Sequence, residues 1–305
     1  MARLANLENG LSARSLRQLY KACITTIADY GSEIWWKSRR SIWPLEAIQS
    51  KASKRILGVF RTAPIAPVEL EAGLWPTRQR LERKAFLYAI RTRRLGIDHP
   101  ISIAIRTLPE RANYRPLKEG IELIPPYKLL RRDTTIRGIQ IRETYLPEDL
   151  GDAKEALHKY LTKEWEKDFE RQRVRKIQRP GSYYNRAKWH PNFEIQANEK
   201  RAISSAYYSL LLGHGYFKSY LYYIGKVDNE DCQCGSRETP EHLLLGCPIY
   251  KDYRPSSLTS RETLDNLRRS RLGKTGIIDF IKSTRIATRP WYTQKEFKER
   301  EEEEE

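Results

Sequence analysis

Apolar side chains recur at helical spacing through most of the chain, and this pattern predicts a mainly α-helical protein. Residues 11–29 form the first periodic segment, with Ser12 as its N-cap and Gly31 as its stop. Residues 44–57 form a second segment, which ends at Gly58. The apolar stripe of this second helix consists of Leu45, Ile48, Ala52 and Ile56.

Helical periodicity returns in four further segments, after one short turn of helix among the prolines of residues 61–77. These segments cover residues 77–95, 152–178, 198–212 and 261–284. Residues 98–151 hold scattered prolines and glycines instead, which indicates short strands or an extended linker. The isoleucines at positions 136, 139 and 141 predict at most one alternating strand there.

Composition divides the chain into four expected parts. Residues 1–97 form a compact helical unit, and residues 98–151 form an irregular linker or remnant. Residues 152–290 form a second helical region, which contains a cysteine cluster. Residues 291–305 end in a run of glutamates, which predicts a disordered acidic tail.

The net charge of +17 and the pI of about 9.7 indicate a polyanionic partner. RNA or DNA is the first expectation and an anionic membrane surface the second. The remaining alternative is a basic surface that contacts only solvent and has no partner. No small-molecule substrate is evident. No signal peptide and no apolar run of about 20 residues is present, so no membrane span is expected. Four cysteines are too few for a disulfide framework, which predicts a reducing nuclear or cytoplasmic compartment.

The helix at residues 77–95 has seven positive side chains and one acid, Glu82. With so few acids to form pairs along the helix, we expect this surface to face nucleic acid. The alternative is a solvated charged face. The positive residues are Arg78, Arg80, Arg83, Lys84, Arg91, Arg93 and Arg94.

A second basic window, residues 171–193, has no acidic residue. Its cations are Arg171, Arg173, Arg175, Lys176, Arg179, Arg186 and Lys188, and its aromatic residues are Tyr183, Tyr184, Trp189 and Phe193. Cations can follow phosphates while aromatic rings stack on unpaired bases, so the window is a candidate for binding nucleic acid. A helix end followed by aromatic packing explains the pattern equally well.

Three of the four cysteines lie with one histidine in the spacing C-x-C-x7-H-x4-C. Three thiols and an imidazole suit a structural zinc ion, which takes four tetrahedral ligands closed to water. The predicted ligands are Cys232, Cys234, His242 and Cys247. A disulfide would leave an odd thiol, and chance clustering is the other alternative. The fourth cysteine, Cys23, falls on an apolar helix face and is expected to be a core residue.

Catalytic signatures are missing from the sequence. The common serine-hydrolase, phosphate-loop and zinc-protease motifs do not occur. Two-metal nucleases and polymerases need clustered carboxylates, but Glu148, Asp149 and Asp152 stand in a loop before a helix, with Asp152 as its expected N-cap. His214, between two glycines, is expected to have a turn or packing role.

Two stretches resemble the polyproteins of non-LTR (LINE-type) retrotransposons, most like those of fungi. The stretches "LRQLYKACITTIADYGSEIWW" and "LEAIQSKASKRILGVFRTAPIAPVELEAGLWPTRQRLERKAFLYAIR" resemble the segment that follows the reverse transcriptase palm. The stretches "LLGHGYFKSYL" and "CQCGSRETPEHLLLGCPIYKDYR" resemble the C-terminal cysteine–histidine segment of the same polyproteins. Together the matches cover residues 12–97 and 152–284.

The resemblance implies a thumb-like unit at residues 1–97 that contacts a template–primer backbone. It also implies a CCHC zinc-knuckle-like element that binds nucleic acid. The family's activity is RNA-directed DNA polymerase, but its paired aspartates would precede residue 1. A ribonuclease H domain, which many relatives carry between the two segments, does not fit residues 98–196. The chain is therefore expected to be an internally deleted remnant with no catalytic residues.

The sequence thus favours a non-catalytic, zinc-containing protein that binds RNA or DNA. One alternative is a fragment of an active reverse transcriptase and ribonuclease H polyprotein. Another is a structural or protein-interaction module, for which long helices and an acidic tail would serve equally well. The last alternative is that the chain is the product of a degenerate element and has no selected function.

Overall fold

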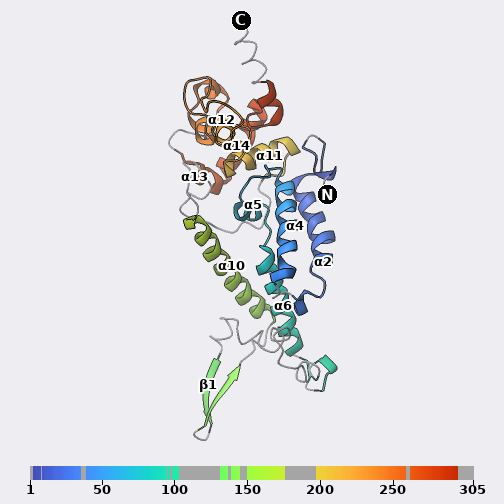
Figure 1. Cartoon of the computed structure of the whole chain (residues 1–305). Helices are drawn as coiled ribbons and strands as arrows, with labels where there is room; N and C mark the ends of the chain where they lie inside the picture. The colour runs from blue at the N-terminus through green and yellow to red at the C-terminus, as the bar shows by residue number, and fades with distance from the viewer. Residues whose placement is uncertain are drawn as a thin grey trace. The chain divides into compact units, whose positions relative to one another are not determined.

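The computed structural model describes residues 3–7, 9–35, 39–93, 95–96, 98–101, 103, 131–136, 139–144, 150–175, 197–258 and 262–294. Most of these residues lie in helices, which confirms the expected fold class (Figure 1). In the part of the chain that is described, no helix has both the length and the apolar character needed to cross a membrane.

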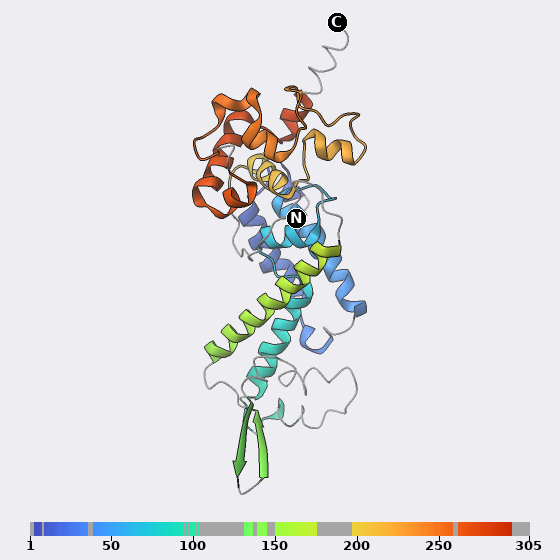
Figure 2. The same ribbon diagram turned by 90° about the vertical axis from the view of Figure 1, so that its left-hand side faces the viewer.

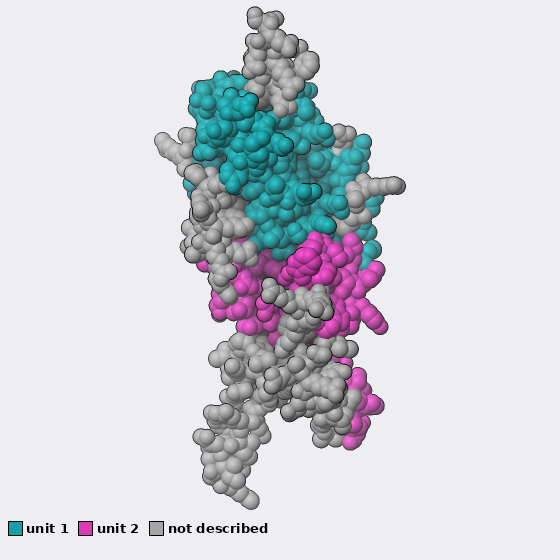
Figure 3. Space-filling model, in the orientation of Figure 1, with its two compact units in different colours: residues 1–23, 50–74, 173–305 teal, residues 24–49, 75–172 magenta. Residues whose placement is uncertain are grey.

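Contacts divide the chain into two compact units, each assembled from separate stretches (Figure 3). Unit 1 consists of Met1–Cys23, Ser50–Leu74 and Arg173–Glu305. Unit 2 consists of Ile24–Gln49 and Trp75–Gln172. The four-part division expected from composition stays a prediction.

The first helical segment begins as expected and then changes its winding. The short 3-10 turn η1 (Arg3–Ala5) precedes α1 (Ala13–Leu19), and the Ser12 hydroxyl accepts a hydrogen bond from the Ser15 N–H at 3.2 Å, which confirms the N-cap. A π-helical turn, η2 (Tyr20–Ile24), then leads into α2 (Thr25–Ala28).

The π-helical turn overturns the expectation for Cys23. Leu16 and Tyr20 are buried, but Cys23 is exposed and Ile27 is 79% exposed. A π turn closes i→i+5 hydrogen bonds and inserts one residue into the helix. The residues that follow are rotated off the apolar stripe, so the prediction of a core cysteine is wrong.

Helix α4 (Arg39–Leu57) begins five residues before the expected start at Pro44, which lies inside the helix. A proline normally marks a first turn because it lacks an N–H, but here the helix continues through it. Gly58, with φ +77°, ends the helix as expected. Ala52 and Ile56 are buried, whereas Ile48 is 45% exposed, so the expected stripe is wrong at that position.

Most of the other helices follow the expected segments closely, namely α5 (Ile65–Glu71), α6 (Thr77–Arg93), α10 (Leu150–Arg175), α11 (Arg201–Leu212), α13 (Leu264–Arg269) and α14 (Arg271–Thr284). Two further helices, α3 (Ser32–Trp35) and α12 (Lys218–Tyr223), form where no helix was expected. The single stretch expected at 261–284 is therefore two helices. Ser270 separates them because its hydroxyl accepts a hydrogen bond from the Gly273 N–H at 2.8 Å and so caps α14.

Two strands form where at most one was expected. β1 (Arg131–Ile136) and β2 (Ile139–Thr144) pair antiparallel as a hairpin, with Arg131 opposite Thr144 and Ile136 opposite Ile139 (Figure 2). Asp152 lies inside α10 rather than at its N-cap, because the helix begins at Leu150. Glu148 and Asp149 lie outside the described residues.

Unit 1 is built around α11, which is buried along nearly its whole length and contacts α5 and α14. Its first residue, Arg201, is only 3% exposed. The guanidinium donates hydrogen bonds to the carbonyls of Arg55 and Ile56 at the end of α4. Burial lowers the pKa of Arg201 to about 10, so the side chain is still positive at neutral pH, where it complements the negative end of the α4 dipole.

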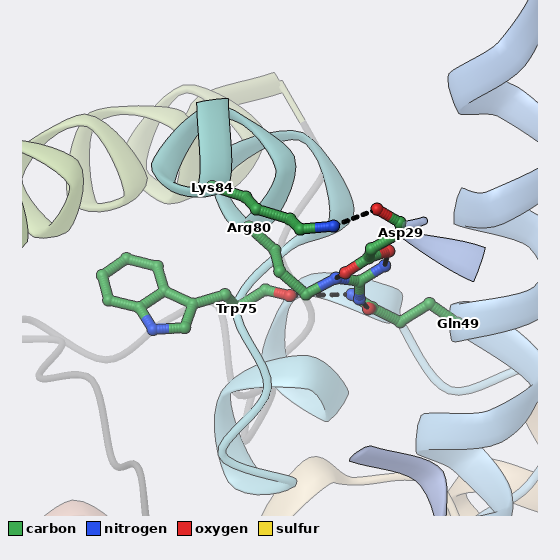
Figure 4. A network of polar contacts seen from close by, with 5 residues as sticks. All are labelled: Asp29, Gln49, Trp75, Arg80 and Lys84. Atoms are coloured by element: carbon green, nitrogen blue, oxygen red, sulfur yellow. Dashed lines mark hydrogen bonds and ion pairs between the residues drawn. The ribbon is translucent and has the colours of Figure 1, made fainter. Parts of the chain in front are cut away.

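Unit 2 contains a polar network around Asp29, which is 7% exposed (Figure 4). Arg80, on α6, donates to both carboxylate oxygens of Asp29, at 2.8 and 2.9 Å, and also bonds to Gln49. Gln49 in turn donates to the Trp75 carbonyl at 2.9 Å, and Lys84 donates to the Asp29 carbonyl. The network therefore fixes α6 against α4 and the turn after α2.

Replacing Arg80 by Leu is expected to destabilise unit 2 by about 2–3 kcal/mol, because the buried Asp29 carboxylate loses its two-pronged partner. Native-state hydrogen exchange of the α6 amides measures the change. Arg78→Leu is the matched control, since Arg78 is exposed on the same helix and its loss should change stability by less than ~0.5 kcal/mol. Equal effects of the two substitutions would contradict the structural role of the Asp29 network.

Candidate metal centre

The four predicted metal ligands meet in a loop of unit 1 that follows α12. The strand-like bridge between Asp231 and Arg237 closes the base of the loop. Within it, the Gly235 N–H bonds to the Cys232 carbonyl at 2.8 Å, and the Cys232 N–H bonds to the Ser236 carbonyl at 2.7 Å. Gly235 has φ +85°, a left-handed conformation that glycine adopts readily, and it allows the tight turn after the second thiol.

His242 and Cys247 are brought to the same place by a single π-helical turn, η4 (His242–Gly246). The His242 N–H donates to the Thr239 hydroxyl at 3.1 Å, and the Cys247 N–H donates to the His242 carbonyl at 2.7 Å. Leu243, Leu244 and Leu245 are buried and anchor the turn. The short 3-10 helix η5 (Pro248–Tyr253) follows directly.

The ligand atoms of Cys232, Cys234, His242 and Cys247 all lie within 4.8 Å of one another. The sulfurs of Cys232 and Cys247 are 3.8 Å apart, and the Cys234 sulfur is 3.1 Å from the His242 Nε2. Zinc–sulfur bonds of about 2.3 Å at tetrahedral angles require sulfurs about 3.8 Å apart, and a sulfur and a nitrogen about 3.5 Å apart. The first pair matches the tetrahedral spacing and the second is slightly tighter, so the four residues are positioned to hold a metal ion.

Burial divides the three thiols of the cluster. Cys232 and Cys247 are buried, and this burial raises the pKa of Cys232 to about 12 and also raises the pKa of Cys247. Burial also tends to raise the pKa of Cys234, but hydrogen bonds from Ser236 and the neighbouring thiols outweigh it, and the pKa is lowered. A metal ion would have to displace protons held firmly by two of the thiols.

Two ionisable side chains that sequence reasoning missed hold the loop in place. Glu238 is fully buried, and its Oε1 accepts a hydrogen bond from the Lys218 N–H at 2.9 Å, at the start of α12. Arg254 donates to the carbonyls of Leu244 and Cys247, both at 2.8 Å, and so fixes the end of η4. The sequence signal for each was its position: Glu238 lies between the predicted ligands Cys234 and His242, and Arg254 follows soon after Cys247.

The structure describes only some of the predicted nucleic-acid contacts, so their common role stays a prediction. On α6, Arg78 and Arg91 are exposed and Arg83 is partly exposed, whereas Arg80 and Lys84 belong to the Asp29 network. Arg93 lies in the last turn of α6, and Arg171, Arg173 and Arg175 lie in the last turns of α10. Outside the described residues are Arg94, Lys176, Arg179, Tyr183, Tyr184, Arg186, Lys188, Trp189 and Phe193.

His214 has the packing role that the sequence suggests. Its Nδ1 hydrogen-bonds with the Leu212 carbonyl at 2.8 Å, and its ring lies 4.8 Å from the ring of Tyr220. These contacts place it in the turn that follows α11.

In the metal-free chain at pH 8, we expect Cys234 to react with iodoacetamide faster than Cys232 and Cys247, because it is better exposed and its pKa is lowered. Peptide mass spectrometry after timed alkylation measures the three rates. Cys23 is exposed and lies outside the cluster, so it serves as an internal reference for an accessible thiol. A faster reaction at Cys232 than at Cys234 would contradict the described geometry.

Comparison with known proteins gives one informative similarity. No family model matches the chain, and no solved structure matches it. Over 285 residues the chain is 25% identical to the "Putative 115 kDa protein in type-1 retrotransposable element R1DM" of Drosophila melanogaster. The match covers 92% of the chain and 23% of that protein, so the chain spans about a quarter of the relative's length. The similarity supports an origin of the chain in a non-LTR retrotransposon.

Proposed function

We propose that the chain is a non-catalytic nucleic-acid-binding part of a retroelement protein, and that a structural zinc ion stabilises its Cys/His loop. The binding of RNA or DNA rests on one observation above all, the net charge of +17. An excess of this size draws the chain to a polyanion through release of the counterions that surround it. The similarity to a retroelement protein agrees with such a partner.

Zinc is the metal proposed because its preferred ligands are those of the loop. Thiolates and a neutral imidazole in a tetrahedral set are typical of structural zinc sites. Cys232, Cys234, His242 and Cys247 would fill all four coordination positions of the ion, which leaves no position open for water or substrate. When bound, zinc would stabilise the deprotonated thiols and tie the two halves of the loop together. The ion would therefore have a folding role.

Cys234→Ser is expected to reduce bound zinc from about one ion per chain to a small fraction, because a hydroxyl is a poor zinc ligand. Metal analysis of the purified protein by inductively coupled plasma mass spectrometry gives the stoichiometry. Cys23→Ser is the matched control, since it removes an exposed thiol outside the loop and should leave the zinc content unchanged. Full metal content in a well-folded Cys234→Ser protein would refute the proposed site.

Binding to single-stranded RNA is expected to weaken by at least about tenfold between 50 and 200 mM salt, as a protein that neutralises several phosphates should. Filter binding measures the affinity at each salt concentration. Replacing Arg78 and Arg91 together by Ala should remove about two of the phosphate contacts that the slope of affinity against salt concentration reports, because both side chains are exposed on α6.

Lys159→Ala is the control for that pair, because the exposed Lys159 on α10 already has Glu155 as a partner at 2.6 Å. Its loss should change the salt dependence little. Binding without salt dependence, or no binding at low salt, would exclude the proposed nucleic-acid role. The alternative is that the chain is a fragment of an active polymerase, and it is considered because the relative is about four times longer than the matched part. Primer extension on an RNA template with magnesium examines it.

A further inference from the structure

The last described residues of the chain, 285–294, form a turn and a short helix that follow α14 in unit 1. The helix covers residues 289–294, and Thr288 directly precedes it. The Thr288 hydroxyl accepts a hydrogen bond from the Trp291 N–H at 3.4 Å and so caps this helix. The C-terminal segment, residues 285–294, is therefore a folded part of unit 1.

The C-terminal segment begins with two non-glycine residues in left-handed backbone. Arg285 has φ +58° and Ala287 has φ +59°. Side chains other than glycine rarely adopt this conformation, and residues in it persist only where the surrounding contacts hold them. Ile286 and Ala287 are 0% and 2% exposed, so the burial of their side chains is one such contact. The turn is strained, and it stays closed only while the segment is held on unit 1.

A second contact of the C-terminal segment leads to the Cys/His loop. The Trp291 Nε1–H donates a hydrogen bond to the Tyr250 hydroxyl at 3.2 Å. Tyr250 lies in η5, and its own N–H donates to the Cys247 carbonyl at 3.3 Å. One residue, Tyr250, therefore bonds both to a candidate metal ligand and to the C-terminal segment.

Helix α14 reinforces this connection through the fully buried Phe280. The ring of Tyr250 stands edge-on to the ring of Phe280, with the ring centres 6.1 Å apart, and the Arg254 guanidinium lies 5.9 Å from the centre of the same ring. Arg254 also donates to the Cys247 carbonyl at 2.8 Å. Because closely packed side chains transmit strain, a movement of Cys247 would disturb the packing of η5 on α14.

The other aromatic residue of the C-terminal segment packs on a separate part of unit 1. The rings of Tyr292 and Tyr216 have their centres 5.7 Å apart, and the ring of Tyr216 lies 4.8 Å from that of Phe60. Tyr216 precedes α12, and Phe60 follows α4. Release of the segment would therefore expose Trp291 and Tyr292 and uncover one side of Tyr216.

We propose that the C-terminal segment is a metal-dependent latch, closed while a metal ion orders the Cys/His loop and released when the ion is lost. The inference rests on the proposed metal site and adds a conformational response to it. With the ion bound, Cys247 is held through its sulfur as well as through its carbonyl, and Tyr250 keeps its position under Trp291. Without the ion, Cys247 has only the carbonyl contacts, and the strained turn at Arg285 and Ala287 opens.

Hydrogen exchange of the full chain, followed by mass spectrometry, examines the proposal. The chain is compared when loaded with zinc and after removal of zinc by 1,10-phenanthroline, and the zinc content of each sample is measured. Amides of residues 285–294 should exchange at least about tenfold faster after zinc removal, because the latch then opens locally. Amides of the buried helix α11 should keep their protection.

Tyr250→Phe separates the latch from the metal site, because it keeps the ring on Phe280 and removes the hydroxyl that accepts from Trp291. Its zinc content should equal that of the native chain, while residues 285–294 exchange about fivefold faster with zinc bound. Zinc removal should then have a smaller effect on these residues than in the native chain. Tyr253→Phe is the matched control, since Tyr253 lies in the same helix and is 57% exposed, and it should behave like the native chain.

Faster exchange confined to the Cys/His loop after zinc removal, with residues 285–294 unchanged, would overturn the latch and leave the metal site intact. Equal acceleration in α11 would also overturn the latch, because the ion would then support unit 1 as a whole. A Tyr250→Phe chain with native exchange would exclude the connection through Tyr250. A native chain that binds no zinc would overturn both proposals.

Discussion

The carboxylate of Glu238 is the constraint on which the C-terminal half of unit 1 depends. Glu238 is fully buried, its side-chain Oε1 accepts a hydrogen bond from the Lys218 N–H at the start of α12, and its backbone N–H donates to the Glu230 carbonyl. A polar group is buried at little cost only where such hydrogen bonds replace its hydration. The position of α12 is therefore fixed by the Cys/His loop, and the loop is fixed by α12.

Helical periodicity and glycine stops were sufficient to predict the main helices. The ends at Gly31 and Gly58 follow from left-handed backbone that glycine adopts without strain, and the Ser12 cap follows from its hydroxyl. Periodicity failed at Cys23 and Ile48. A π-helical turn displaces the first, and the second is exposed although it lies on the apolar stripe of α4. Such local changes depend on which partner each face meets, and spacing alone does not contain that information.

The candidate metal ligands could be predicted because the three cysteines and the histidine lie close together in the sequence, so that short-range turns are enough to bring them together. The residues that hold the loop, Glu238 and Arg254, could not. Glu238 bonds to the backbone N–H of Lys218, and Arg254 bonds to the backbone carbonyl of Cys247. Every residue type has a backbone carbonyl, and all but proline have an N–H, so the sequence does not indicate such partners. Arg80, expected to face nucleic acid, binds the side chain of Asp29, and its spacing along α6 does not reveal which acid of an earlier segment it meets.

The discontinuous make-up of unit 1 has a consequence for how the chain is made. Its N-terminal stretch, residues 1–23, belongs with residues 50–74 and with a segment that begins only at residue 173. On the ribosome, about 150 residues are synthesised between the end of the first stretch and the start of the third, at roughly 5–20 residues per second. During that interval of roughly 8–30 seconds, the buried Leu16 and Tyr20 can meet residues 50–74 but not the third stretch of unit 1. Part of the apolar face of α1 therefore stays uncovered until the third stretch has been synthesised, and unit 1 can close only when α11 and the later helices α12, α13 and α14 exist.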